Sequence, residues 1–125
     1  MKLEFLPGGS EDCPLVRLYD FAAAEVDRLF AIVSAIATGG QESIAIHDMP
    51  EVDVVGECRL FLRSGSKDRG LLQLSNRAQF ECVLTSGSWD NTAALIEPFV
   101  HGRGGYQWLV TTGDANLLLS SDGLW

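Results

Sequence analysis

Hydrophobic residues recur at three- and four-residue spacing in one stretch of the chain, residues 21–38. They are Val26, Leu29, Phe30, Val33, Ile36 and Ala37. This spacing stacks them on one face of an α-helix and predicts the longest helix of the protein. Asp20 is the expected N-cap, and Gly39 with Gly40 supplies the permissive backbone that ends the helix. Such a helix is long enough to seal one face of a small sheet.

Elsewhere hydrophobic and polar residues alternate with a period of two, which is typical of strands with one buried face. The predicted strands cover residues 2–5, 16–19, 43–47, 58–63, 71–74, 78–85, 106–110 and 117–119. We expect the first two to form a hairpin and the three between 58 and 85 to form a meander. A second, shorter helix is predicted over residues 89–99, with Ser88 as its N-cap.

The order of these elements predicts the fold class. Consecutive strands joined by short turns favour an antiparallel sheet, and both helices need a surface on which to bury their apolar faces. The sequence therefore predicts one α+β domain over residues 1–125. Its expected architecture has two layers, with a mainly antiparallel sheet of about six to eight strands and the long and the short helix packed on one face.

Charge narrows the range of partners. The 125 residues carry a formal net charge of −8 and only nine Lys and Arg. Nucleic-acid binding draws on clustered cations, so we expect no nucleic acid among the partners, whereas a negative field favours a basic protein. No stretch reads as a signal peptide or a membrane span, and three cysteines without paired spacing agree with a reducing compartment. We expect a cytoplasmic protein with no membrane partner.

Motifs of the main enzyme classes are absent from the sequence: it has no phosphate-binding loop, dinucleotide fingerprint, zinc-protease motif or hydrolase elbow. Cys58 and Cys82 fall in register with apolar strand residues, which predicts buried thiols. Cys13 has acidic surroundings that disfavour a thiolate nucleophile. We therefore predict no catalytic residue, no metal and no cofactor.

The densest group of polar side chains lies around a break between predicted strands. It comprises His47, Asp48, Glu51, Asp53 and Glu57. Its four carboxylates are the candidate binding residues for a basic partner, although a plain solvated edge explains them as well. A second interpretation joins His47 and Asp48 to His101 in a small hydrolase or metal-dependent enzyme, because a His with an Asp can perform acid–base work. The cations that follow, from Arg59 to Arg77, are expected to pair with the acidic strand.

Three tryptophans and a tyrosine fall in the last third of the chain: Trp89, Tyr106, Trp108 and Trp125. The helix and strand patterns assign Trp89 and Trp108 to the core. Trp125 is the expected contact in a groove or a homodimer interface, and Arg103, in a glycine-rich loop, is a second interface candidate.

Together these observations predict a non-enzymatic domain that binds a basic protein through its carboxylates, as an inhibitor or immunity-type protein does. The small enzyme and a homo-oligomeric accessory domain are the alternatives.

Overall fold

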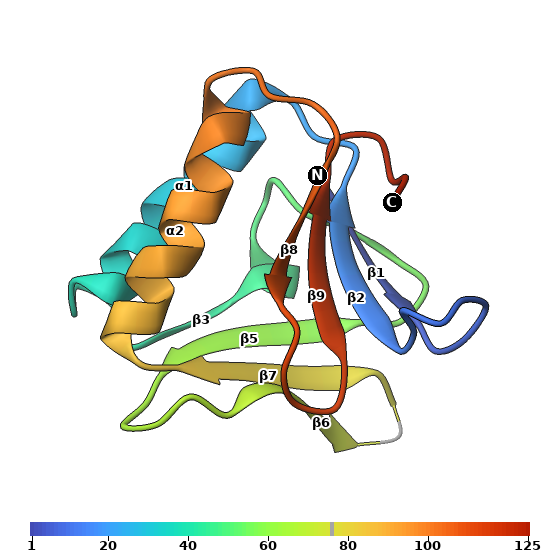
Figure 1. Ribbon diagram of the computed structural model, residues 1–125, viewed down its shortest axis with the longest axis horizontal. Helices are drawn as coiled ribbons and strands as arrows, with labels where there is room; N and C mark the ends of the chain where they lie inside the picture. The colour runs from blue at the N-terminus through green and yellow to red at the C-terminus, as the bar shows by residue number, and fades with distance from the viewer. Residues whose placement is uncertain (76) are drawn as a thin grey trace.

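The computed structural model describes residues 1–75 and 77–125 (Figure 1). The described residues form two helices, a 3₁₀ turn and nine strands. In chain order the elements are β1 (Lys2–Leu6), β2 (Leu15–Tyr19), α1 (Ala23–Ala37), β3 (Ser43–Ala45), the 3₁₀ turn η1 (Ile46–Asp48), β4 (Asp53–Val55), β5 (Arg59–Ser64), β6 (Gly70–Ser75), β7 (Gln79–Leu84), α2 (Ser86–Val100), β8 (Tyr106–Val110) and β9 (Asn116–Ser120).

The strands form two mixed sheets instead of the single, mainly antiparallel sheet that the sequence predicts. Sheet A has the order β4-β1-β2-β9-β8, and sheet B has the order β3-β5-β7-β6. The α+β class and the β1–β2 hairpin are confirmed. The predicted meander is wrong, because β7 lies between β5 and β6 and runs parallel to β5. This pairing sets the most apolar residues of the two strands side by side in the core. They are Leu60, Leu62, Phe80 and Cys82.

Three walls enclose the core (Figure 1). The helices α1 and α2 pack against each other on one side, sheet A stands opposite them, and sheet B closes the bottom of the view. One cluster of buried residues draws on both sheets and both helices. Phe5 of β1 contacts Phe80 of β7 with ring centroids 4.7 Å apart, and Phe21 contacts Phe99 of α2 at 5.9 Å. On the outer side of sheet A, Leu15 and Leu118 are fully buried although neither belongs to this cluster, so part of that side is already covered within the chain.

The long helix α1 is shorter at both ends than its pattern predicts. Its N-cap is Ala22, whose backbone N–H donates to Oε1 of Glu25 at 2.8 Å. Asp20, the predicted N-cap, has a φ of 54°, and its carboxylate pairs with Lys2 at 3.0 Å. The left-handed backbone at Asp20 turns the chain out of β2, so the helix begins only after that turn. Its buried stripe consists of Val26, Leu29, Ile32, Val33 and Ile36.

The second helix, α2, begins at Ser86, ahead of its predicted start. Thr85 and not Ser88 is the N-cap, and the Thr85 hydroxyl oxygen accepts the backbone N–H of Ser88 at 3.3 Å. Trp89 is fully buried, as predicted, and its indole N–H donates to the carbonyl of Arg63 at 3.0 Å. In the described part of the chain, no helix is both long and apolar enough to cross a membrane.

Two glycines allow the sheets to meet at one corner, where the turn between β8 and β9 reaches β6. The backbone N–H of Leu71 donates to the carbonyl of Thr112 at 2.9 Å, and that of Asp114 donates to the carbonyl of Leu71 at 2.8 Å. Gly70 and Gly113 have φ values of 79° and 97°. A Cβ on Gly113 would lie 2.5 Å from the Leu71 carbonyl oxygen. A residue without a side chain is therefore required where the backbones approach.

Candidate functional site

The outer face of sheet A, which points away from the helices in Figure 1, carries aromatic side chains in two adjoining rows. The strand register places Glu4, Arg17, Leu118 and Trp108 in one row and Lys2, Tyr19, Ser120 and Tyr106 in the next. The segment that follows β9 adds two more apolar side chains. We define the aromatic face as Arg17, Tyr19, Tyr106, Trp108, Leu124 and Trp125.

Arg17 lies at the centre of the aromatic face. Its Nε donates to Oε1 of Glu4 at 3.0 Å, and its Nη1 donates to the carbonyl of Gly123 at 2.7 Å. The guanidinium stacks on the Tyr19 ring at 3.9 Å from the centroid and lies 5.8 Å from the centroid of the Trp125 ring. These contacts use both the planar fork and the flat face of the guanidinium. The guanidinium therefore stacks on one aromatic ring and lies near a second.

The segment after β9 folds back toward this face. The Ser120 hydroxyl donates to the carbonyl of Leu124 at 2.8 Å, and the indole N–H of Trp125 donates to Oδ2 of Asp12 at 3.1 Å. Leu118 of the sheet is fully buried, whereas Trp125 is 38% exposed and Leu124 is 70% exposed. Trp125 is therefore anchored by its nitrogen and still presents apolar surface to solvent.

Tyr106 and Trp108 form the β8 edge of the aromatic face. Their rings meet edge to face with centroids 6.4 Å apart, and Tyr106 is 45% exposed. Trp108, predicted to lie in the core, is on the outer side and half-buried. A β-bulge between Trp108 and Val110 turns Val110 into the core, so the simple alternation does not persist to the end of the strand.

Two side chains cap the free edge of β8. Arg103 Nη2 donates to the carbonyl of Tyr106 at 3.4 Å, and Gln107 Nε2 donates to the carbonyl of Trp108 at 3.0 Å. An edge strand whose carbonyls are occupied is a poor template for an added strand. Arg103, an interface candidate from the sequence, therefore protects this edge, and a partner would contact side chains without extending sheet A.

The acidic candidates lie near the opposite edge of sheet A. Asp53 belongs to β4 and stands in register with Lys2 of β1. The Asp48 side chain is 75% exposed, and Glu57 is exposed after β4. Glu51 is partly neutralised, because its Oε1 lies 3.7 Å from Nε of Arg28. Of these carboxylates, that of Asp53 lies beside β1, whereas the turn η1 with Asp48 packs on β5 of sheet B.

The residues of the enzymatic interpretation are only partly brought together. The His47 side chain is 6% exposed, its Nδ1 accepts the backbone N–H of Leu60 at 3.0 Å, and its Nε2 lies 3.7 Å from Oδ1 of Asp48. His101 is the exposed C-cap of α2. Within residues 1–75 and 77–125, no three His, Cys, Asp or Glu side chains are placed to hold a metal ion, so these three do not share a metal site.

The cysteines of the core are confirmed as buried: Cys58 is 3% exposed and Cys82 is 0% exposed. Desolvation by burial raises the pKa of both thiols to about 12. They stay protonated at neutral pH and are poor nucleophiles. Cys13 is partly exposed before β2, with its Sγ 3.6 Å from Oγ of Ser10.

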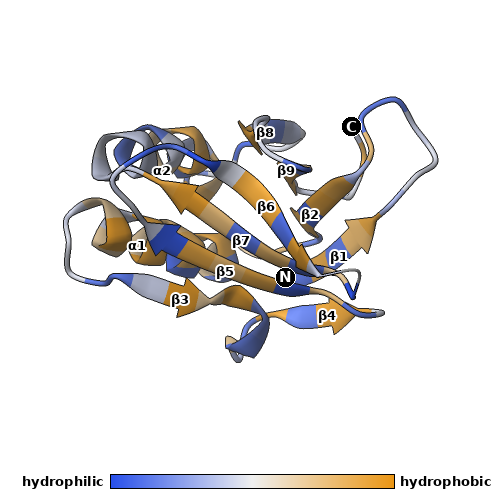
Figure 2. Ribbon diagram, turned by 90° about the horizontal axis from the view of Figure 1, so that it is seen from below, coloured by the Kyte–Doolittle hydropathy of each residue, from blue (hydrophilic) through white to orange (hydrophobic). Residues whose placement is uncertain are grey.

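The expected pairing of the cations from Arg59 to Arg77 with the acidic strand is wrong. Arg59 and Arg63 belong to β5 of sheet B, the other three lie in the loops that join its strands, and no ion pair of the described residues joins any of them to β4. Arg63 of β5 pairs with Glu81 of β7, whereas the acidic strand β4 belongs to sheet A. Figure 2 views this outer side of sheet B from below and shows no helix across it. The prediction failed because β4 and β5, which are neighbours in the sequence, belong to different sheets.

Sequence reasoning did not identify four residues of the aromatic face as candidates: Arg17, Tyr19, Tyr106 and Leu124. The first two were detectable, because the alternation in β2 sets them opposite its buried residues. Tyr106 was not, since both sides of its strand carry apolar residues. Comparisons of the chain with models of known protein families, with curated proteins and with solved structures find no match. The chemistry of its own surface is therefore the basis for assigning a function.

Proposed function

We propose that the protein is a non-enzymatic binding domain that recognises a basic protein partner through the aromatic face of sheet A. The observation that carries the proposal is the exposure of Tyr106 and Trp125 on one face, with Trp125 near the Arg17 guanidinium and Tyr106 against Trp108. The few residues that supply most of the binding energy in protein interfaces are enriched in tyrosine, tryptophan and arginine, and binding costs less where such side chains are ordered in advance.

The charges around the aromatic face favour a basic partner. Exposed carboxylates at its margins include Glu11 and Asp122, and Asp53 of β4 lies beyond β1. Lys2 is paired with Asp20, and Arg17 is paired with Glu4, so the cations of this side are neutralised. With a net charge of −8, the whole chain attracts a cationic protein over long range. An inhibitor or immunity-type protein is one form that this function would take.

A capture experiment with matched variants tests the proposal. Wild-type protein, a Tyr106→Ala/Trp125→Ala variant and a Phe61→Ala/Leu74→Ala variant of sheet B are immobilised and exposed to the native lysate. We expect wild type and the sheet B variant to retain the same basic protein, and the sheet A variant to lose it. Salt at about 0.5 M should release the partner, because the steering charges are screened.

Affinities measured with the purified partner make the test quantitative. The sheet A variant should bind about 100-fold more weakly, and the sheet B variant should bind as wild type does. Equal loss in both variants, or capture of an acidic protein, contradicts the proposal. Light scattering on the free protein tests whether a second copy of this chain covers the aromatic face instead. If the wild type is a dimer and the sheet A variant is a monomer, this face is a homodimer interface.

A further inference from the structure

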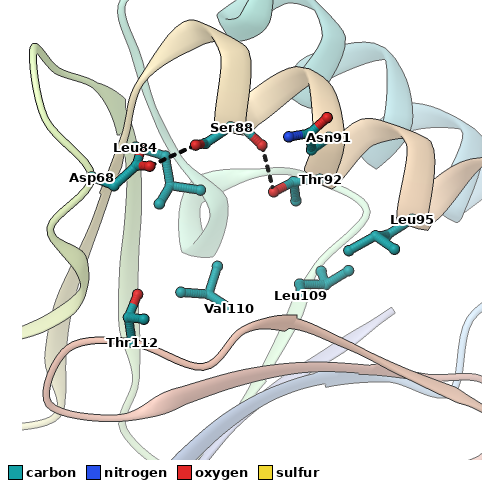
Figure 3. A pocket seen from close by; sticks show the side chains of 9 residues that line it. All are labelled: Asp68, Leu84, Ser88, Asn91, Thr92, Leu95, Leu109, Val110 and Thr112. Carbon is teal, nitrogen blue, oxygen red and sulfur yellow. Dashed lines mark hydrogen bonds between the residues drawn. The ribbon is translucent and has the colours of Figure 1, made fainter.

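A hollow of about 320 Å³ lies between α2 and the end of β8, on the inner side of the β8 edge (Figure 3). One part of its wall is aliphatic and consists of Leu84, Leu95, Leu109 and Val110. The remainder is polar and includes a single carboxylate, that of Asp68, from the loop between β5 and β6. The close-up shows Leu95, Leu109 and Val110 on the side of the hollow away from Asp68. Leu84 lies beside Asp68, and Asn91 and Thr92 lie between Ser88 and Leu95, so the wall mixes apolar and polar side chains and has its carboxylate at one end.

Asp68 is held in place by neutral donors. The backbone N–H of Thr85 donates to Oδ1 at 2.8 Å, and the hydroxyl of Ser88 donates to Oδ2 at 2.7 Å. The Thr85 and Ser88 hydrogen bonds lower the pKa of the carboxyl below its usual value of 3.8, so it is fully charged at neutral pH. Neighbouring Lys67 and Arg69 are exposed, and in the described part of the chain no cation forms an ion pair with Asp68.

The N-terminus of α2 offsets only part of this negative charge. A helix terminus carries roughly half an elementary charge, against the full charge of the carboxylate. The Thr92 hydroxyl, 4% exposed, donates to the carbonyl of Ser88 at 3.0 Å and keeps its lone pairs available beside the hollow. Acceptor oxygens therefore meet at one end, around the one charged group among the described residues that line the hollow, and the exposed cations Lys67 and Arg69 flank that group in sequence.

We infer that the hollow binds an aliphatic chain that ends in an ammonium group, namely a lysine side chain of the basic partner. The methylene stem packs on Leu95, Leu109 and Val110, and the ammonium group reaches the carboxylate of Asp68. An anionic ligand is repelled by Asp68. A planar aromatic ligand finds no ring on which to stack among the described residues that line the hollow.

This inference deepens the proposed function and rests on it for the source of the lysine. Trp108 and Leu109 are consecutive in β8, and they belong to the aromatic face and to the hollow respectively. A partner that covers the β8 edge therefore reaches both, with its aromatic contacts outside and one lysine inside.

Binding of a small probe to the free protein tests the hollow without the partner. Hexylammonium, 1-hexanol and hexanoate share one tail and differ in the head group, and methyl NMR spectra report on Leu95, Leu109 and Val110. We expect hexylammonium to shift these methyl signals in a saturable way, with a dissociation constant of about 1–10 mM. Hexanol should bind about three- to fivefold more weakly, and hexanoate should not bind.

Three variants distinguish what the ammonium head group and the hydrocarbon tail of the probe each contribute to binding. Asp68→Asn should reduce the affinity for hexylammonium to that for hexanol, while Asp90→Asn, an exposed carboxylate on the same helix, should leave it unchanged. Leu95→Ala, at a position that is 36% exposed, should weaken the binding of hexylammonium and of hexanol equally. The inference is overturned if hexylammonium shifts none of these methyl signals, if hexanol binds as well as hexylammonium, or if Asp68→Asn changes nothing.

The two proposals fail in different ways. If the partner requires Tyr106 and Trp125 but the probe does not bind, the lysine site is wrong and the binding function stands. If the probe binds as expected and no basic partner is retained, the site stands as a receptor for alkylammonium groups and the proposed function falls.

Discussion

The two outer faces carry a similar ion pair in different surroundings. On sheet A, the side chains of Arg17 and Glu4 are 17% and 20% exposed. On sheet B, those of Arg63 and Glu81 are 48% and 20% exposed. Arg17 also stacks on Tyr19 and donates to a backbone carbonyl, whereas among the described residues the Arg63 side chain pairs with Glu81 alone.

This difference indicates how a surface is prepared for binding. A guanidinium fixed by stacking, a carboxylate and a carbonyl loses little further freedom when a partner arrives, so the rings beside it act as rigid anchors. An exposed ion pair keeps its mobility and its water, and it contributes little to either stability or affinity. Sheet A therefore presents an ordered aromatic surface. Sheet B presents a solvated, charged surface in which Phe61 is half-buried.

The largest expected effect comes from separating the two sheets at their shared corner. Gly113→Ala should lower the free energy of unfolding by about 2–4 kcal/mol, because its Cβ meets the Leu71 backbone in addition to straining a positive φ. Gly39→Ala is the matched control, since Gly39 has a φ of 80° and open space around it. Gly39→Ala should lower the free energy of unfolding by only about 1 kcal/mol. Urea unfolding measures the free energy of unfolding of both variants. Equal losses would mean that the close contact between Gly113 and Leu71 does not stabilise the fold.

A smaller effect distinguishes the two arginines. Arg17→Ala should lower the free energy of unfolding by about 2–3 kcal/mol, because it removes a stacked, partly buried guanidinium and leaves Glu4 without its cation. Arg63→Ala should cost less than about 1 kcal/mol, as exposed pairs do. The two variants are compared by urea unfolding at low and high salt. If Arg63→Ala proves as costly as Arg17→Ala, the contrast between the faces is wrong.

Much of the fold was predictable from local pattern, and the sheet assignment was not. The long helix, the β1–β2 hairpin and the burial of Trp89 follow from spacing and alternation, which act over a few residues. The division into two sheets depends on the pairing of β2 with β9 and of β5 with β7. Such pairings are decided by which apolar faces fit together in the core, and no short-range signal reports them.

The candidate site was likewise predictable in its residue types but not in the contacts that position them. Trp125 and Arg103 were identified from residue type, but their positions depend on contacts with Asp12 and with the carbonyl of Tyr106. Trp108 was misplaced because alternation defines two sides of a strand without saying which side is covered. The hollow at Asp68 was not predicted at all, since three separate segments of the chain meet there.

The smallest expected effect concerns Asp68, the carboxylate within the cation-rich segment of sheet B that binds α2 instead of a cation. Hydrogen bonds from Thr85 and Ser88 hold its pKa below 3.8 in the folded protein, while the unfolded chain has the usual value. Its contribution to stability is therefore complete above that value and is lost as the pH falls through the folded pKa. The gap in unfolding free energy between wild type and Asp68→Asn should be constant near neutral pH and should shrink below about pH 4.

Ser88→Ala removes one hydrogen-bond donor to Asp68. The loss of stability on acidification should then begin at a higher pH, because with fewer donors the carboxyl group takes up its proton at a higher pH. Urea titrations from about pH 7 to about pH 2.5 measure all three proteins, and a gap that does not change with pH would show that the Asp68 charge plays no part in holding sheet B to the helix.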